Sequence, residues 1–158
     1  NAKMSPHDGF VFNIFTAALE GGIGYWSICT TRYRWQEAER TGDLRKMGVT
    51  VELTEPVGKA DGFETPWTGK GKPPKYRIDA DVIRRGLERI VAAKGPYYDP
   101  NGAGTQCSDV PFLCRSVQRT VLNANRDLGE GFDEDGEVDA NIADQIVQVG
   151  LFGRVVFG

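Results

Sequence analysis

Histidine and cysteine are scarce in this chain of 158 residues, which has one His and three Cys. His7 lies near the N-terminus, so a Ser-His-Asp or Cys-His catalytic group would depend on a residue from an end of the chain. The cysteines are odd in number and lack C-x-x-C spacing, which argues against a disulfide framework and against a zinc site. We expect reduced, mostly buried thiols at Cys29, Cys107 and Cys114.

Long apolar runs are also missing. No stretch approaches the ~20 residues that cross a bilayer, and the first residues lack a cationic region followed by an apolar one. We therefore expect a soluble, cytoplasmic protein that does not associate with membranes. Met4 is a candidate initiator, which would make residues 1–3 an addition left by cloning.

A strong net charge is absent as well, because 19 Lys and Arg are opposed by 22 Asp and Glu, for a net charge of −3. The charge is unevenly divided. Residues 1–95 hold 15 basic and 12 acidic residues, whereas residues 96–158 hold 4 basic and 10 acidic residues. A basic first part favours a phosphate-bearing or acidic partner, although this surplus is small.

The composition is typical of a globular protein, with 40% hydrophobic and 26% charged residues. A chain of this length fits one domain that buries about two-thirds of the surface its unfolded form exposes. We predict a single α+β domain over residues 1–158. Residues 1–8 are expected to be flexible, and the glycine- and proline-rich stretch 56–74 is expected to be a long exposed loop.

Hydrophobic periodicity predicts about four helices that cover a small, mostly antiparallel sheet of three to four strands. Ser5 or Asp8 is expected to cap the first helix, and Asp79 and Asp139 are expected to cap later ones. The polar stretch 36–46 is expected to lie outside the core. We predict helices over residues 9–19, 80–94 and 140–151, and a further helix that Ser108 or Asp109 caps and that ends near residues 127–131. Strands are predicted over 25–31, 49–53 and 76–78, and a closing strand or apolar tail over 154–157.

A glycine-rich corner follows the first predicted helix, and two aromatic residues come directly after it. Gly21, Gly22 and Gly24 permit positive φ angles and close approach of another group. The order of helix, glycines and strand is the reverse of a phosphate-binding loop, so we exclude a dinucleotide or P-loop site. We interpret the corner as a helix C-cap with Tyr25 and Trp26 packed inward; the alternative is a ligand site that these two rings line.

Two basic stretches are candidates for contact with an anion. Arg32 and Arg34 alternate with aromatic residues, a pattern that can stack bases and neutralise phosphates. Trp67, Lys70 and Lys72 lie in the long glycine-rich loop, where lysines can approach a phosphate. The structural alternatives are a strand that exposes its arginines and a hairpin tip with Trp67 folded back on the sheet.

An acidic stretch between the last two predicted helices invites comparison with a calcium loop. Asp133, Asp135 and Asp139 are weak calcium candidates. In the standard register, Gly131 occupies the first ligand position and Ile142 the position of the closing Glu, so the twelve-residue cage is broken at both ends. We favour a solvated turn in which Asp139 caps the last helix, and we expect no metal and no cofactor.

Three segments cover predicted helices and the first strand but not the loops: 17–26, 79–87 and 144–153. They resemble parts of small proteins that actinobacterial phages and related mobile elements encode. The resemblance implies a phage-type viral accessory protein in the host cytoplasm, and it brings no activity with it.

We therefore expect a non-catalytic protein that binds a host protein, or a nucleic acid or nucleotide-like anion, through the two basic stretches. One alternative is an enzyme that acts on a nucleotide or another small molecule, with Tyr25, Trp26 and nearby acids in its pocket. Another is a structural or dimer-forming protein. The sequence leaves the oligomeric state open.

Overall fold

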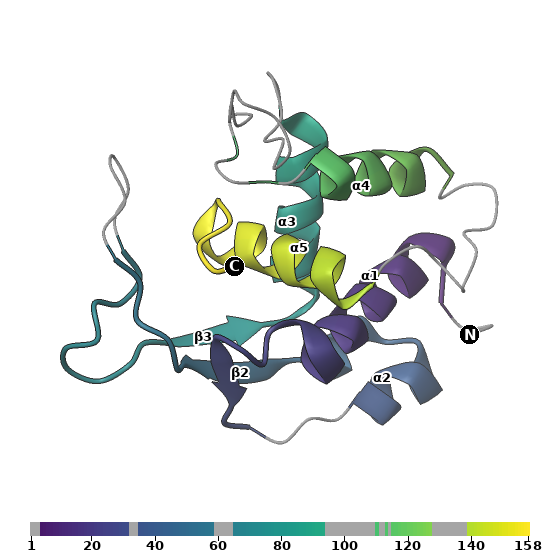
Figure 1. Ribbon diagram of the computed structural model, residues 1–158. Helices are drawn as coiled ribbons and strands as arrows, with labels where there is room; N and C mark the ends of the chain where they lie inside the picture. Colours follow the sequence, from purple (N-terminus) through teal and green to yellow (C-terminus); the bar gives the residue numbers. More distant parts are fainter. Residues whose placement is uncertain are drawn as a thin grey trace.

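The computed structural model describes residues 4–31, 35–58, 65–93, 110, 113, 115–127 and 139–158, and over these it has the predicted α+β architecture (Figure 1). Five α-helices accompany a three-stranded antiparallel sheet, with a π-helical and a 3-10 segment between them. In chain order the elements are α1 (Pro6–Ala17), η1 (Ala18–Gly22), β1 (Ser27–Cys29), α2 (Trp35–Thr41), η2 (Leu44–Lys46), β2 (Val49–Leu53), β3 (Lys75–Ile78), α3 (Ala80–Ala92), α4 (Arg115–Asp127) and α5 (Ala140–Phe152).

The sheet has the strand order β1-β2-β3, so β1 and β3 are its edges. The period-two pattern of β2 is confirmed: Val49, Val51 and Leu53 are buried, and Thr50 and Glu52 between them are partly exposed. Ile28 of β1, Glu52 and Lys75 of β3 are paired in one row across the sheet and therefore share its outer face.

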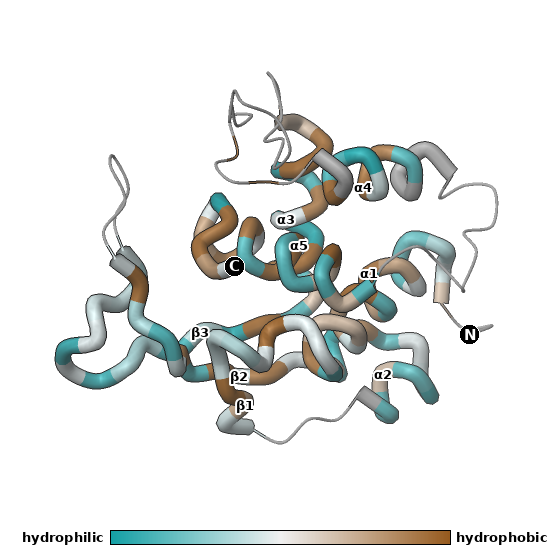
Figure 2. Tube along the Cα trace, in the orientation of Figure 1, coloured by the Kyte–Doolittle hydropathy of each residue, from teal (hydrophilic) through white to brown (hydrophobic). Residues whose placement is uncertain are grey.

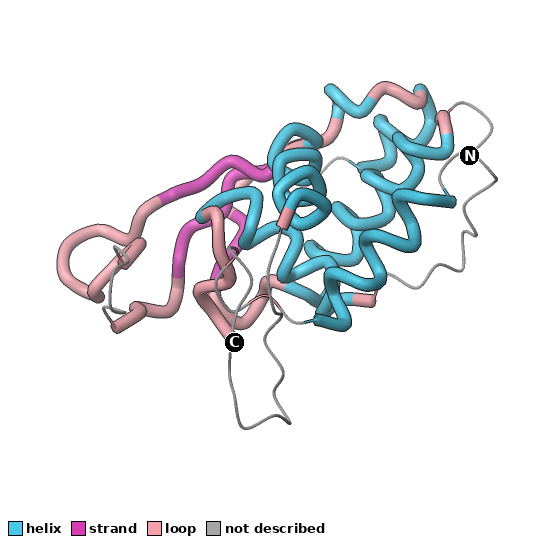
Figure 3. Tube along the Cα trace, turned by 90° about the horizontal axis from the view of Figure 1, so that it is seen from above, coloured by secondary structure: helices cyan, strands magenta, loops and turns pink. Residues whose placement is uncertain are grey.

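Helices α1, α3 and α5 lie on the inner face of the sheet, and α4 packs on α3 farther out (Figure 1). Seen from above, the loop between β2 and β3 projects away from the helices (Figure 3). Hydrophobic stretches concentrate in β2 and in the helices next to it (Figure 2). Burial of this apolar surface is the main force that holds the two layers together.

The predicted helix caps are confirmed. Asp79 Oδ1 accepts a hydrogen bond from Val82 N at 3.1 Å, and Asp139 Oδ1 accepts one from Ile142 N at 2.9 Å. Of the two candidates for α1, Ser5 is the cap. α1 therefore begins at Pro6, earlier than predicted, and its first turn lies inside the segment that we expected to be flexible.

The glycine corner differs from the prediction of positive φ angles. Gly21, Gly22 and Gly24 do not have them, because the helical chain continues through η1 as a π-helix instead of ending in a left-handed cap. The prediction of close approach is correct for Gly22, where an added Cβ would lie 2.7 Å from the Ala140 carbonyl oxygen. The missing side chain lets η1 pack on the start of α5.

Helices α3 and α5 cross at two glycines. A Cβ on Gly86 would overlap the carbonyl oxygen of Ile146, and a Cβ on Gly150 would overlap that of Val82. Each helix thus presents backbone to backbone at the crossing. The close approach brings the buried residues of the two helices into one core.

Two other predictions are wrong. The stretch 36–46 contributes Ala38 and Leu44 to the core, because α2 and η2 turn these two apolar side chains inward. Cys29 is exposed rather than buried, since it lies on edge strand β1. Cys107 and Cys114 are outside the described residues.

After α5 the chain forms an apolar tail and no strand, which was one of the two predicted alternatives. Gly153 has φ 74° and ends α5 in the left-handed conformation. Val155 and Phe157 are then buried in the core. Within the described parts of the chain, no helix is long and apolar enough to cross a membrane.

The Asp139 cap gives a direct test of the last helix. Asp139→Ala is expected to lower the free energy of unfolding by about 1 kcal/mol, because it leaves a first-turn N–H of α5 without its acceptor. Asp139→Asn keeps an acceptor oxygen and is expected to cost only a few tenths of that amount. Urea unfolding of both variants, with and without calcium, measures the difference. A calcium-induced rise in stability that both substitutions abolish would contradict the capping role.

Candidate functional site

The loop between β2 and β3 holds three of the predicted contact residues. Trp67 is half-buried, whereas Lys70 and Lys72 are exposed. Trp67 Nε1 donates a hydrogen bond to Lys70 O at 3.1 Å, and Val57 N donates to Trp67 O at 2.9 Å. The loop thus folds on itself, and the indole N–H of Trp67 is used inside the loop. Arg32 and Arg34 lie outside the described residues, so their predicted contribution is untested.

Two further cations continue the loop along edge strand β3. Lys75 and Arg77 are both exposed, and since they are two residues apart they point to the same outer face, about 6.6 Å from each other along the strand. We call Lys70, Lys72, Lys75 and Arg77 the basic strip. Arg77 was not among the predicted site residues, although its period-two spacing from Lys75 is a signal that could have placed it there.

The Arg77 side chain lies against Gly48, the residue before β2. An added Cβ on Gly48 would overlap the Arg77 guanidinium, so glycine at that position leaves room for the side chain. Arg77 Nε lies 3.7 Å from Asp79 Oδ2, and the Arg77 side chain remains 60% exposed. The guanidinium is thus positioned at the surface with most of its N–H donors open to solvent.

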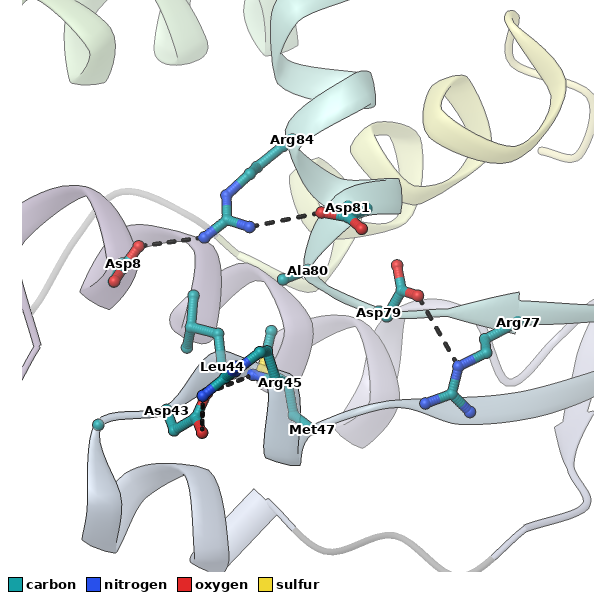
Figure 4. Close-up of a pocket in the computed structure, with 11 residues that line it drawn as sticks. Asp8, Asp43, Leu44, Arg45, Met47, Arg77, Asp79, Ala80, Asp81 and Arg84 are labelled. Atoms are coloured by element: carbon teal, nitrogen blue, oxygen red, sulfur yellow. Dashed lines mark hydrogen bonds and ion pairs between the residues drawn. The ribbon is translucent and has the colours of Figure 1, made fainter.

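The basic strip ends at a polar hollow of about 380 Å³ (Figure 4). Arg84 of α3 forms ion pairs with two aspartates: its Nη2 lies 3.2 Å from Asp8 Oδ1 of α1, and its Nη1 lies 3.5 Å from Asp81 Oδ1. Arg45 lies 3.0 Å from Asp43, and its guanidinium lowers the pKa of that carboxyl. The hollow is lined by Asp8, Gly42, Asp43, Leu44, Arg45, Met47, Arg77, Asp79, Ala80, Asp81 and Arg84.

The hollow is better suited to ionic contact than to catalysis or metal binding. Each of its four aspartates has an arginine partner, and Asp79 also caps α3. Over the described ranges, no three His, Cys, Asp or Glu side chains are grouped to hold a metal ion. Of the calcium candidates, Asp139 is a helix cap, while Asp133 and Asp135 lie outside these ranges.

The structure separates the two aromatic residues of the glycine corner. Trp26 is 0% exposed and fills the core, whereas Tyr25 is 49% exposed. Trp26 Nε1 donates to Asp144 Oδ1 at 2.8 Å, and the Tyr25 hydroxyl donates to Asp144 Oδ2 at 2.5 Å. Gln148 Nε2 donates to Asp144 Oδ1 at 2.8 Å. The two aromatic residues therefore hold a buried carboxylate of α5.

This buried polar cluster, Tyr25, Trp26, Asp144 and Gln148, was not predicted. Burial raises the pKa of the Asp144 carboxyl, although hydrogen bonds from Tyr25, Gln148 and Trp26 oppose the shift. Burial and the charge of Asp144 raise the pKa of the Tyr25 hydroxyl. Asp144 is 3% exposed and lines none of the three hollows described for the protein, so the carboxylate is closed to solvent although Tyr25 beside it is half-exposed.

Comparison with known proteins finds no matching family model, no matching curated protein and no matching solved structure. The resemblance to phage-encoded proteins therefore stays a prediction.

Proposed function

We propose that the protein is a non-catalytic binding protein for a phosphate-bearing anion, a nucleic acid or a nucleotide, and that the basic strip is its contact surface. The observation that carries the proposal is the run of four exposed cations along one loop and the outer side of one edge strand. Ammonium and guanidinium groups bind phosphate through charge and hydrogen bonds without any chemical step.

The charges around the basic strip support this proposal. Glu52 lies opposite Lys75, and Asp79 pairs with Arg77. Lys70 and Lys72 have no acidic partner among the described residues. The strip therefore carries a net positive charge in a chain whose total charge is −3. The aspartates of the hollow would repel a long polyanion beyond Arg77, which favours a short contact of a few phosphates.

The buried polar cluster also supports a non-catalytic role. Catalysis needs a titratable group that a substrate reaches. Asp144 has the shifted pKa but accepts hydrogen bonds from Tyr25, Trp26 and Gln148 inside the core. The Asp144 carboxylate therefore stabilises the fold, and the aspartates of the hollow form ion pairs with arginines.

The triple variant K70Q/K72Q/K75Q tests the strip. We expect it to bind a labelled single-stranded oligonucleotide at least about ten-fold more weakly than the wild type at about 50 mM salt, because three phosphate contacts are lost. The slope of log K against log salt is expected to fall in magnitude by about 2. Fluorescence anisotropy over a salt series measures both quantities.

The matched control is R40Q/K46Q/R119Q, which removes the same charge from exposed positions outside the strip. Its affinity is expected to stay close to that of the wild type. Equal losses in the two triple variants would show that total charge, and not the strip, governs binding. Absence of wild-type binding to oligonucleotides and nucleotides at low salt would overturn the proposal.

An acidic partner protein is a second candidate, and one observation favours it. Ile28 is 57% exposed on the outer sheet face, in the same row as Lys75. An exposed apolar side chain on the same sheet face as a cation, with Glu52 between them, suits a protein surface better than a phosphate chain. Ile28→Ser should leave the affinity for an oligonucleotide unchanged but weaken the complex with a partner protein. The phage resemblance implies that this partner is a protein of the host cell.

A further inference from the structure

The segment 154–157 lies in a groove whose residues bind its main chain. Gln148 is fully buried, and its Oε1 accepts hydrogen bonds from Val156 N and Phe157 N, each at 2.7 Å. Its Nε2 donates to Phe157 O at 3.2 Å. One glutamine amide therefore satisfies both N–H groups and one carbonyl of an extended segment, as a neighbouring strand would.

The same groove holds an aromatic side chain. The ring of Phe157 stacks on Trp26 with a centroid distance of 5.0 Å and an interplanar angle of 1°. Phe152 closes the slot edge-on, at 6.1 Å from Phe157. Parallel and edge-on ring contacts of this kind add to the free energy of burying the ring.

The walls of the groove are held by contacts that do not involve the segment. Asp144 binds Trp26 Nε1, the Tyr25 hydroxyl and Gln148 Nε2. Tyr25 has one hydroxyl hydrogen, which is donated to Asp144, so its oxygen lies 3.3 Å from Phe157 O without donating there. Phe152 is supported by an edge-on contact with Tyr76 at 5.2 Å. The wall residues are therefore held by one another as well as by the segment.

We propose that this groove is a recognition site for an extended peptide that carries an aromatic side chain, and that residues 154–157 occupy it in cis. The ligand class follows from the seated segment: two main-chain N–H groups, one carbonyl and one phenyl ring. The side chain of Val155 is buried as well, so a partner peptide makes the same contacts when it carries Phe in the same place and an apolar residue two positions before it.

The cis segment regulates the site by competition. Gly153, with φ 74°, is the joint between α5 and the segment, and a ligand joined by so short a connection has an effective concentration in the mM range or higher. An outside peptide therefore binds when the cis segment is released. This site meets β3 through Tyr76, which alternates with Lys75 and Arg77 and so lies on the opposite face of the strand. It does not depend on the proposed anion binding.

The full-length variant V156P/F157A releases the segment, because proline removes one N–H donor and alanine empties the slot. The probe is a labelled peptide with the sequence of residues 154–158, and its control has Ala in place of Phe. We expect the variant to bind the Phe peptide at least about ten-fold more tightly than the Ala peptide. The wild type and the control variant V156T, which keeps the N–H and the ring, are expected to bind neither peptide.

Gln148→Ala in the released variant is expected to abolish binding, as measured by fluorescence anisotropy. If V156P/F157A is unfolded in the absence of peptide, circular dichroism measures whether a peptide refolds it. Refolding on addition of the Phe peptide, but not of the Ala peptide, supports the site. A folded variant that ignores the Phe peptide overturns the proposal. So does an unfolded variant that stays unfolded with it, or equal binding of the two peptides.

Discussion

Replacing Asp144 with alanine is expected to lower the free energy of unfolding by about 3 kcal/mol or more. The substitution leaves the buried N–H of Trp26 and one N–H of Gln148 without an acceptor, and each unsatisfied group costs about 1 to 3 kcal/mol. The Tyr25 hydroxyl loses its acceptor at the same time. Denaturant unfolding followed by circular dichroism measures the loss.

Asp144→Asn is the matched control, because it keeps the shape of the side chain. Its carbonyl oxygen can still accept from Trp26 and Gln148, and its amide can donate to the Tyr25 oxygen. We expect it to cost about 1 kcal/mol, roughly the value of one ordinary hydrogen bond. Equal stability of the Ala and Asn variants would contradict the assigned role of the carboxylate.

Comparison of the wild type with Asp144→Asn measures how the contribution of Asp144 to stability depends on pH. Its pKa in the folded state is raised above the ordinary value of 3.8, so the folded state binds the proton more tightly than the unfolded state. This contribution to stability is fully present below pH 3.8 and is lost as pH rises through the raised pKa. The stability of the wild type relative to Asp144→Asn should therefore fall across that window. A relative stability that rises there would show that the pKa is lowered.

Alanine at Gly86 or Gly150 is expected to destabilise the protein by about 2 to 3 kcal/mol, although alanine favours helix formation. The new Cβ would overlap a carbonyl oxygen of the facing helix, and a backbone atom cannot move aside as a flexible side chain can. α3 and α5 would have to separate, which opens space among the buried residues near the crossing. Thermal and urea unfolding of the single variants measure the effect.

Gly9 is the matched control for this prediction. It is also a helical glycine, in α1, but an added Cβ there meets nothing within 4 Å. Gly9→Ala should therefore stabilise the protein by up to about 1 kcal/mol through helix propensity. If alanine at Gly86 and Gly150 were also stabilising, the two helices would not be in backbone contact.

The elements that the sequence predicts well are those with local signals. Asp79 and Asp139 precede helices with regular apolar spacing, and the alternation in β2 follows directly from its two faces. Arg77 could have been placed with Lys75 by the same alternation. The close packing at the glycine corner was predicted, whereas its π-helical geometry has no clear signal in three glycines.

The groove and the buried polar cluster had no such signal. Asp144 lies on the last helix, where a charged residue is ordinarily exposed, and its partner Trp26 is 118 residues away in the chain. In the sequence, Gly86 and Gly150 are residues of low helix propensity, and their role in the packing of α3 on α5 is seen only in the folded structure. Contacts between distant segments decide these features, and a single sequence does not reveal them.

The crossing of α3 and α5 has a consequence for how the molecule opens. Helices that meet through side chains can part by rotamer changes, but these two meet at carbonyl groups on both sides. They can separate only by movement of a whole helix. Amide hydrogens of α3 and α5 should therefore exchange with solvent in a single cooperative event, so the strand that precedes α3 and the segment that follows α5 are attached to one rigid body.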